Sequence, residues 1–378
     1  MLQIEVNKET LHTCVSGILE TIDFQIKTWK IEAMSSRTVN FTTKGIFRLS
    51  GLADVMGEEV PWSLVVKVIQ PESEEKDDTQ HHNYWKREAL VYQSGLLSDL
   101  PTVIRTPKCY AVEEVREDSI WIWLEELKED NSGKWTESQF ASVAKKLGIF
   151  HGAYLTGKLV PMQEWICQNW LESWIDGCKM YASNPEEFLP FVEEETEDIW
   201  SAYKLLNQNL DKHLDMLKKL PQVLSHQDLS QQNMYMDPNG ENFKLIDWQY
   251  LSISSVGEEL GKLFGVALSQ DDIPIDRAEE YMELLFSHYV EGLGEAGWRG
   301  DTTIPMYSYY LSFACRSFWE VPKLIKLLAE PKVKPIEPDK LNLVSEIVNL
   351  QTKFGRRADN LFQQVSQNLE VNHAIFTR

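Results

Sequence analysis

The N-terminal third of the chain has the hydrophobic pattern of a β-sheet. Short segments alternate apolar and polar positions or are almost wholly apolar, as strands do. Five strands are predicted, at residues 24–33, 45–55, 64–69, 108–114 and 120–127. One helix is predicted between the third and fourth strands, from about residue 80 to residue 97. This part of the chain is therefore expected to be a small sheet with one helix.

The pattern changes after residue 127. A turn cluster at Asp130–Gly133 is the best candidate for a domain boundary. Thr136 and Gln139 then have the spacing of a capping box, and apolar residues recur at helical spacing as far as Tyr154. The rest of the chain has mostly helical patterning.

One segment, Val223–Tyr250, interrupts the helical half with a loop, a turn at Asp237–Gly240 and a strand. The fold class is therefore α+β. We expect residues 1–127 to form a β-rich N-terminal lobe and residues 128–378 a larger, mostly helical C-terminal lobe.

Composition narrows the class of protein. A chain of 378 residues is comfortable for two domains, and 43% hydrophobic with 25% charged residues is ordinary globular usage. No apolar run reaches the length of a membrane span, and the N-terminus has no apolar core of a secretory signal. Five scattered cysteines without a C-x-x-C pair indicate reduced thiols in the cytoplasm and argue against a zinc site.

The formal charge of −21, from 58 acidic and 37 basic residues, argues against nucleic acid as the main partner. A cationic small molecule would suit an acidic protein, but solubility alone also explains the charge.

Two charged residues stand in apolar surroundings. Lys67 is flanked by β-branched residues, so it is either a buried ammonium that needs a partner or an edge-strand lysine that reaches water. Glu88 falls within the apolar stripe of the predicted helix, and it is either buried or at the edge of the stripe. Because a helix that follows a strand packs back onto it, Lys67 and Glu88 are candidates for a buried ion pair.

The interrupting segment carries four polar residues within 22 positions: His226, Asp228, Asn233 and Asp247. Carboxylate and amide oxygens are ligands that Mg²⁺ accepts together with water and substrate phosphate. Isolated loop residues of these types usually serve turns, but four together favour a site.

These residues resemble the catalytic and metal-binding segments of the aminoglycoside phosphotransferase and choline kinase family, which has the protein-kinase-like, bilobal fold. The spacing His226-x-Asp228-x-x-x-x-Asn233 matches without gaps, and Asp247 follows at the family's distance. Lys67 matches the lysine of the third strand, and Glu88 matches the glutamate of the next helix.

The resemblance implies an ATP- and Mg²⁺-dependent phosphotransferase with Asp228, in the loop 225–233, as the catalytic base. It implies that Asn233 and Asp247 bind Mg²⁺ and that Lys67, held by Glu88, contacts the α and β phosphates. His226 would be a scaffold for the loop.

By the same resemblance, adenine would bind the backbone from Glu125 to Leu127. Trp121 and Trp123, on the strand before it, are expected to be core residues.

The sequence departs from the family, and from protein kinases, in several respects. No G-x-G-x-x-G precedes Lys67, so the loop Ser35–Lys44 is expected to cover the phosphates. Gln227 replaces the arginine of protein kinases, and Glu259 replaces the family's aspartate after the metal-binding segment. The replacement at Glu259 leaves the role of its carboxylate open. The missing glycine motif and Gln227 count against a protein kinase.

The acceptor is expected to be a small hydroxylated molecule. Acidic and aromatic residues in the helical half, such as the run 193–198 and Trp174, suit a cationic amino sugar or amino alcohol. The alternative is that the acidic residues are a solvated surface and the aromatic residues are core. A catalytically inactive nucleotide-binding protein is the rival reading from another functional class, and a protein kinase the rival among enzymes.

Overall fold

The computed structural model describes residues 5–34, 42–127, 133–179, 184–236, 243–316, 318–329 and 338–376. The chain divides into two compact units, Met1–Ser132 with Tyr235–Tyr250 and Gly133–Met234 with Leu251–Arg378. Three expected loops or turns lie wholly or largely outside the described residues: Ser35–Lys44, Asp130–Gly133 and Asp237–Gly240.

The first unit is built on a five-stranded antiparallel sheet in the order β1-β2-β3-β5-β4. The strands are β1 (Gln25–Met34), β2 (Thr43–Val55), β3 (Glu58–Ile69), β4 (Cys109–Arg116) and β5 (Ser119–Glu125). All five predicted strands are present. Trp121 and Trp123 of β5 are buried, as expected for core residues.

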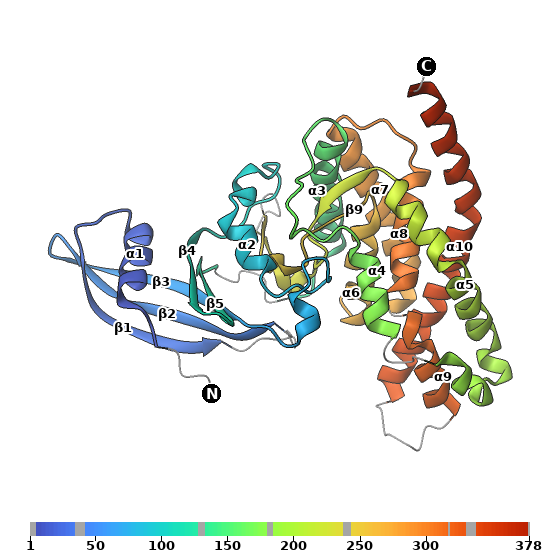
Figure 1. Cartoon of the computed structure of the whole chain (residues 1–378), viewed down its shortest axis with the longest axis horizontal. Helices are drawn as coiled ribbons and strands as arrows, with labels where there is room; N and C mark the ends of the chain where they lie inside the picture. Colours follow the sequence, from blue (N-terminus) through green and yellow to red (C-terminus); the bar gives the residue numbers. More distant parts are fainter. Residues whose placement is uncertain are drawn as a thin grey trace. The chain divides into compact units, whose positions relative to one another are not determined.

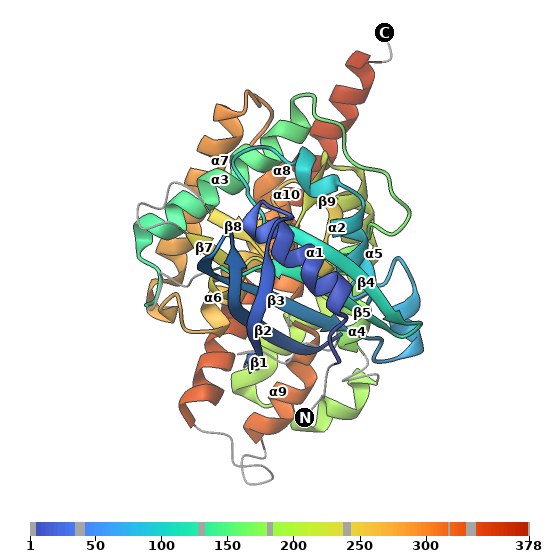
Figure 2. The same ribbon diagram turned by 90° about the vertical axis from the view of Figure 1, so that its left-hand side faces the viewer.

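The described residues of the first unit form two α-helices, so the expectation of one was wrong. Helix α1 (Lys8–Leu19) begins after Asn7, whose side chain accepts hydrogen bonds from the backbone N–H groups of Glu9 and Thr10. Its buried residues join the core of the sheet, and Figures 1 and 2 show the helix lying against the sheet. The apolar positions Leu11, Cys14 and Val15 carried this signal.

Helix α2 (Arg87–Gln93) is shorter than predicted. The residues before it form turns around the buried guanidinium of Arg87, which donates hydrogen bonds to the carbonyls of Thr79, His81 and His82. A side chain that binds three carbonyls of one segment competes with the helical pattern of that segment, and this explains the late start of α2.

The second unit is mostly helical. Its helices are α3 (Glu137–Leu155), α4 (Trp170–Lys179), α5 (Glu197–Lys219), α6 (Glu258–Ser269), α7 (Ala278–Glu295), α8 (Thr303–Cys315), α9 (Val321–Ala329) and α10 (Pro338–Phe376). The predicted capping box of Thr136 and Gln139 opens α3. Helices α5 and α8 both pack against the long helix α10 (Figure 1).

Helices α3 and α7 approach closely where each has a glycine. A Cβ atom at Gly148 would lie 2.1 Å from Tyr289 O, and one at Gly292 would lie 1.9 Å from Lys145 O. Only glycine fits at these two crossing points. No helix within the described ranges is both long and apolar enough to span a bilayer.

Short strands bracket the loop 225–233 and precede Asp247. Strand β6 (Gln222–Ser225) pairs antiparallel with β9 (Ser252–Ser255), and β7 (Met234–Met236) pairs with β8 (Phe243–Leu245). Strand β6 leads directly into the loop 225–233, and β8 leads directly to Asp247.

Candidate active site

Lys67 lies between two carboxylates in the first unit. Its Nζ is 2.6 Å from Glu88 Oε2 and 2.8 Å from Asp247 Oδ1. Strand β3 pairs with β2 on one side and β5 on the other, so Lys67 is not an edge-strand residue. Lys67 is 6% exposed and Glu88 1%, which excludes the readings that place either side chain in water.

The surroundings set the charge of this cluster. Burial acts to lower the pKa of Lys67, but the charges of Asp247 and Glu88 outweigh it and raise that pKa above its usual value. Burial raises the pKa of Glu88 to about 7 against the opposing charge of Lys67. The ammonium is therefore retained in the folded protein.

The backbone of Asp247 has a left-handed conformation, with φ 64°. Such a conformation is uncommon for a residue other than glycine and persists only where neighbours hold it. Gln249, two residues later, provides that hold. Its backbone carbonyl accepts a hydrogen bond from Arg87, and its side chain bonds to Asn83 and Thr42.

Glu125 and Leu127, the expected adenine-binding positions, also belong to the first unit. The backbone N–H of Glu125 donates to Lys108 O, and its carboxylate accepts hydrogen bonds from Lys244 Nζ and the Lys108 N–H. A base bound at this residue would therefore meet its carbonyl rather than its N–H.

The second unit holds Asp228 and Asn233. The amide nitrogen of Asn233 donates to Asp228 Oδ2 at 2.8 Å and to the Asp228 backbone carbonyl at 2.9 Å. This orientation leaves Oδ1 as the atom of Asn233 that could bind a metal ion. An amide oxygen is one of the oxygen donors that suit Mg²⁺.

Glu259 anchors the loop 225–233, and this settles the role that the sequence left open. One carboxylate oxygen accepts the backbone N–H of Gln227, and the other lies 3.0 Å from His151 Nε2. The other ring nitrogen of His151 lies 2.8 Å from the Tyr289 hydroxyl, which also accepts the backbone N–H of Gly257. These groups are fully or almost fully buried, so the loop rests on a rigid polar network.

Gln227, the residue in the arginine position of protein kinases, is also part of the anchor. Its backbone is left-handed, with φ 59°, and its side-chain amide donates to Ser254 and Glu258. Burial raises the pKa of Glu258 to about 7. The side-chain nitrogen of Gln227 bonds to groups inside the unit. Gln227 therefore does not take the part of the phosphate-binding arginine of protein kinases.

The structure adds one residue that the sequence analysis missed. Lys262 of α6 is 5% exposed, and its Nζ lies 3.1 Å from Asp228 Oδ1. Asp228 is thus held on both carboxylate oxygens, by Lys262 and by Asn233. Lys262 interrupts an apolar stretch between Leu260 and Leu263, which is the same signal that singled out Lys67.

The surroundings of Lys262 destabilise its charged form. Its Nζ lies 5.8 Å and 5.9 Å from the ring centres of Trp170 and Trp174, and the guanidinium of Arg316 faces the same rings. Burial and the charge of Arg316 lower the pKa of Lys262 to about 8, against the opposing charge of Asp228.

This pKa predicts a pH dependence of stability. The ordinary pKa of a lysine is 10.5, so between about pH 8 and that value the unfolded chain binds more protons at Lys262 than the folded chain does. The free energy of unfolding of the wild type, measured relative to Lys262→Met by urea denaturation, should rise by about 2 kcal/mol from pH 8 to pH 10.

The exposed lysine variant Lys134→Met is the control for general alkaline effects. A wild-type minus Lys262→Met difference that stays flat over this range would contradict the buried charge.

The chain is similar to one family model and to several solved structures. A family model described as "Uncharacterized oxidoreductase dhs-27" matches residues 161–347. No curated protein sequence matches the chain. The amicoumacin kinase, in complex with AMP-PNP, Ca²⁺ and Ami, is 12% identical over 93% of this chain and 94% of its own, with a TM-score of 0.50.

Two other kinases have lower TM-scores. A choline/ethanolamine kinase family protein from Mesorhizobium loti is 13% identical, covers 88% of this chain and 92% of its own, and has a TM-score of 0.47. An ethanolamine kinase from Plasmodium vivax is 11% identical, covers 92% and 84%, and has a TM-score of 0.45. At these identities a structural likeness shows the fold alone. The match to the amicoumacin kinase spans nearly the whole chain, and so this chain has the protein-kinase-like fold that the resemblance implied.

Proposed function

We propose that this protein is an ATP- and Mg²⁺-dependent phosphotransferase of the aminoglycoside phosphotransferase and choline kinase family. Its acceptor is the hydroxyl group of a small molecule. The observation that carries the proposal is the buried ammonium of Lys67 between the carboxylates of Glu88 and Asp247. In phosphoryl transfer the protein mainly positions groups and neutralises charge, and this cluster supplies a fixed cation beside a metal-binding carboxylate.

The residues of the first unit bind the nucleotide in this proposal. Lys67 contacts the α and β phosphates, and Glu88 fixes its ammonium. The backbone at Glu125 and Leu127 binds adenine. Asp247 and Asn233 Oδ1 hold Mg²⁺, which when bound neutralises charge on the phosphate oxygens.

Asp228 accepts the proton of the acceptor hydroxyl as that oxygen forms its bond to the γ-phosphorus. The bond from the γ-phosphorus to the bridging oxygen breaks, and ADP leaves. Because Lys262 and Asn233 each hold one carboxylate oxygen of Asp228, the base is oriented before the acceptor binds.

The description of the matching family model as an oxidoreductase does not give a second candidate function. Dinucleotide-dependent oxidoreductases bind their cofactor at a parallel sheet built from strand–helix–strand units. In the described part of residues 161–347, the longest paired strands are the antiparallel β6 and β9. No specific observation therefore favours hydride transfer.

The first test is nucleotide binding. Mg-ATP at a hundredfold excess over its dissociation constant should stabilise the protein by about 2.7 kcal/mol, measured as a rise in melting temperature. The same ATP with a chelator of divalent ions should give a much smaller rise in melting temperature. The phosphates then lack the Mg²⁺ that Asp247 and Asn233 bind in this proposal.

An unchanged melting temperature with Mg-ATP would contradict the proposal. A shift without ADP release for any acceptor would instead favour the rival, a nucleotide-binding protein without catalysis.

A further inference from the structure

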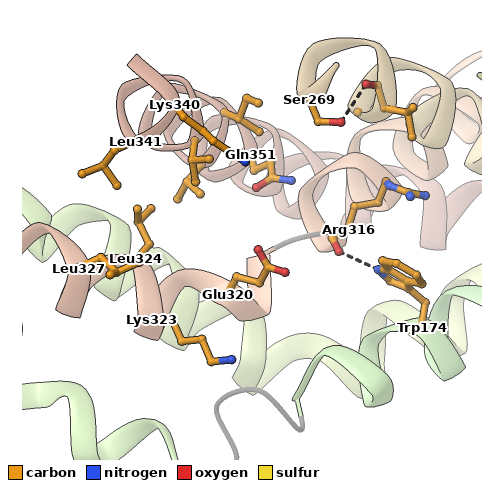
Figure 3. A pocket seen from close by; sticks show the side chains of 15 residues that line it. Trp174, Ser269, Arg316, Glu320, Lys323, Leu324, Leu327, Lys340, Leu341 and Gln351 are labelled. Carbon is orange, nitrogen blue, oxygen red and sulfur yellow. Dashed lines mark hydrogen bonds between the residues drawn. The ribbon is translucent and has the colours of Figure 1, made fainter. Parts of the chain in front are cut away.

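The second unit contains a cavity of about 570 Å³. This is within the size range of small-molecule binding sites. It is formed by α4, α6, α9, α10 and the residues between α8 and α9. The side chains that line it include Trp174, Val266, Arg316, Glu320, Leu324 and Val344 (Figure 3).

The cavity is amphipathic along its length. Leu324, Leu327 and Leu341 gather at one end, and Arg316 and Trp174 lie at the other (Figure 3). Further apolar residues of α10 join the leucines: Val344, Ile347 and Val348. The cavity therefore suits a ligand with an apolar chain and one polar end.

The polar end adjoins the candidate catalytic base. Gly265 and Val266 line the cavity and follow Lys262 by three and four residues, so they lie on the same face of α6 about 5.4 Å further along. A Cβ atom at Gly265 would lie 3.3 Å from Arg316 Cδ, which shows how closely Arg316 crosses the helix there. Lys262 and Arg316 also lie over the same two rings, those of Trp170 and Trp174, and Lys262 contacts Asp228. The Arg316 end of the cavity is therefore the end on the side of the candidate base.

The charge of the lining opposes a cationic ligand. Among the described residues that line the cavity, three side chains are cationic, those of Arg316, Lys323 and Lys340, and one is a carboxylate, that of Glu320. Lys262 adds a further cation on the side of the polar end. The acidic run 193–198, which suggested a cationic acceptor, does not line this cavity, and neither do Glu280 and Glu283 of α7. Charge complementarity therefore favours an anion.

We propose that this cavity binds the acceptor, and that the acceptor is an amphiphilic alcohol with a hydroxyl and an anionic group at the same end of an apolar chain. The inference rests on the proposed phosphotransferase function and assigns its substrate class. The hydroxyl reaches Asp228, the anionic group pairs with Arg316, and the apolar chain extends along the leucines.

The test compares probes that share one chain and differ in charge: 3-hydroxydecanoate, 1,3-decanediol and 1-amino-3-decanol, with choline as a cation without an apolar chain. Binding is measured by calorimetry and transfer by ADP release, both with the wild-type protein. We expect 3-hydroxydecanoate to bind at least tenfold more tightly than the amine and to give the highest kcat/KM, with the diol between them.

Two variants locate the binding. Val344→Trp fills the apolar end of the cavity and should weaken binding of 3-hydroxydecanoate at least tenfold. Leu205→Trp is the matched control, because Leu205 is an exposed apolar residue of α5 (45% exposed, against 37% for Val344) outside the cavity lining. The control should bind as the wild type does, and both variants should keep the Mg-ATP shift.

Tighter binding or faster transfer with the amine or choline would overturn the inference and leave the phosphotransferase proposal standing. Equal binding to both tryptophan variants would also overturn it, because the ligand would then bind elsewhere. Binding of 3-hydroxydecanoate without ADP release, in a protein that Mg-ATP stabilises, would overturn its assignment as the acceptor. The absence of a Mg-ATP shift would count against the phosphotransferase itself.

Discussion

Replacing Asp228 with asparagine should lower turnover at least a hundredfold and leave Mg-ATP binding near that of the wild type. Acid–base groups usually contribute a hundredfold to ten-thousandfold to the rate. Asparagine keeps the size of the side chain and an oxygen that can still meet Lys262 or Asn233, but it cannot take the proton of the acceptor. ADP release measures the turnover, and the rise in melting temperature with Mg-ATP measures the binding.

The matched control is Asp211→Asn, at an exposed position of α5 remote in sequence from the catalytic loop. It should change neither quantity. Unchanged turnover in Asp228→Asn would remove Asp228 from the role of base. Loss of the Mg-ATP shift in that variant would mean that Asp228 serves nucleotide binding instead.

Replacing Lys67 with methionine should destabilise the protein by about 3 kcal/mol and abolish the Mg-ATP shift. Removing one partner of a buried ion pair leaves an uncompensated charge, which typically costs about 3–5 kcal/mol. Here two carboxylates are left behind: that of Glu88, which is 1% exposed, and that of Asp247. The free energy of unfolding from urea denaturation at neutral pH measures the loss.

Two further variants separate the causes. Lys27→Met breaks an exposed ion pair with Asp54 in the same unit, and should cost at most about 1 kcal/mol. Adding Glu88→Leu to Lys67→Met should restore part of the stability, because it removes the more deeply buried of the two carboxylates and leaves only Asp247 without its cation. It should not restore the Mg-ATP shift. A loss no larger in Lys67→Met than in Lys27→Met would contradict the buried pair.

Features of the candidate site that depend on residues close in sequence could be predicted from the sequence. A lysine in an apolar strand and a glutamate in an apolar helical stripe predicted a buried pair, and the structure confirms that Lys67 and Glu88 form one. The same reasoning applied to Lys262 would have found a second buried lysine. It was missed because its partner, Asp228, is distant in sequence and belongs to the loop, not to the helix that carries Lys262.

Other features had no local signal strong enough to decide them. The late start of α2 depends on the side chain of Arg87 binding carbonyls upstream of it, which competes with a helical pattern. The role of Glu259 depends on contacts with Gln227 and His151, which come from two other segments.

By itself, the sequence determined the strands, the capping box of α3, the candidacy of Lys67 and Glu88 for a buried pair, and the H-x-D-x-x-x-x-N loop, because periodicity and spacing act between near neighbours. Only the tertiary structure decided what surrounds each charge: the second carboxylate on Lys67, the ammonium of Lys262 on Asp228, and a cavity whose described lining has more cations than carboxylates. Net charge sums over the whole chain, whereas a binding site depends on the few side chains that folding brings to one place. An acidic protein can for that reason have a cavity with a basic lining.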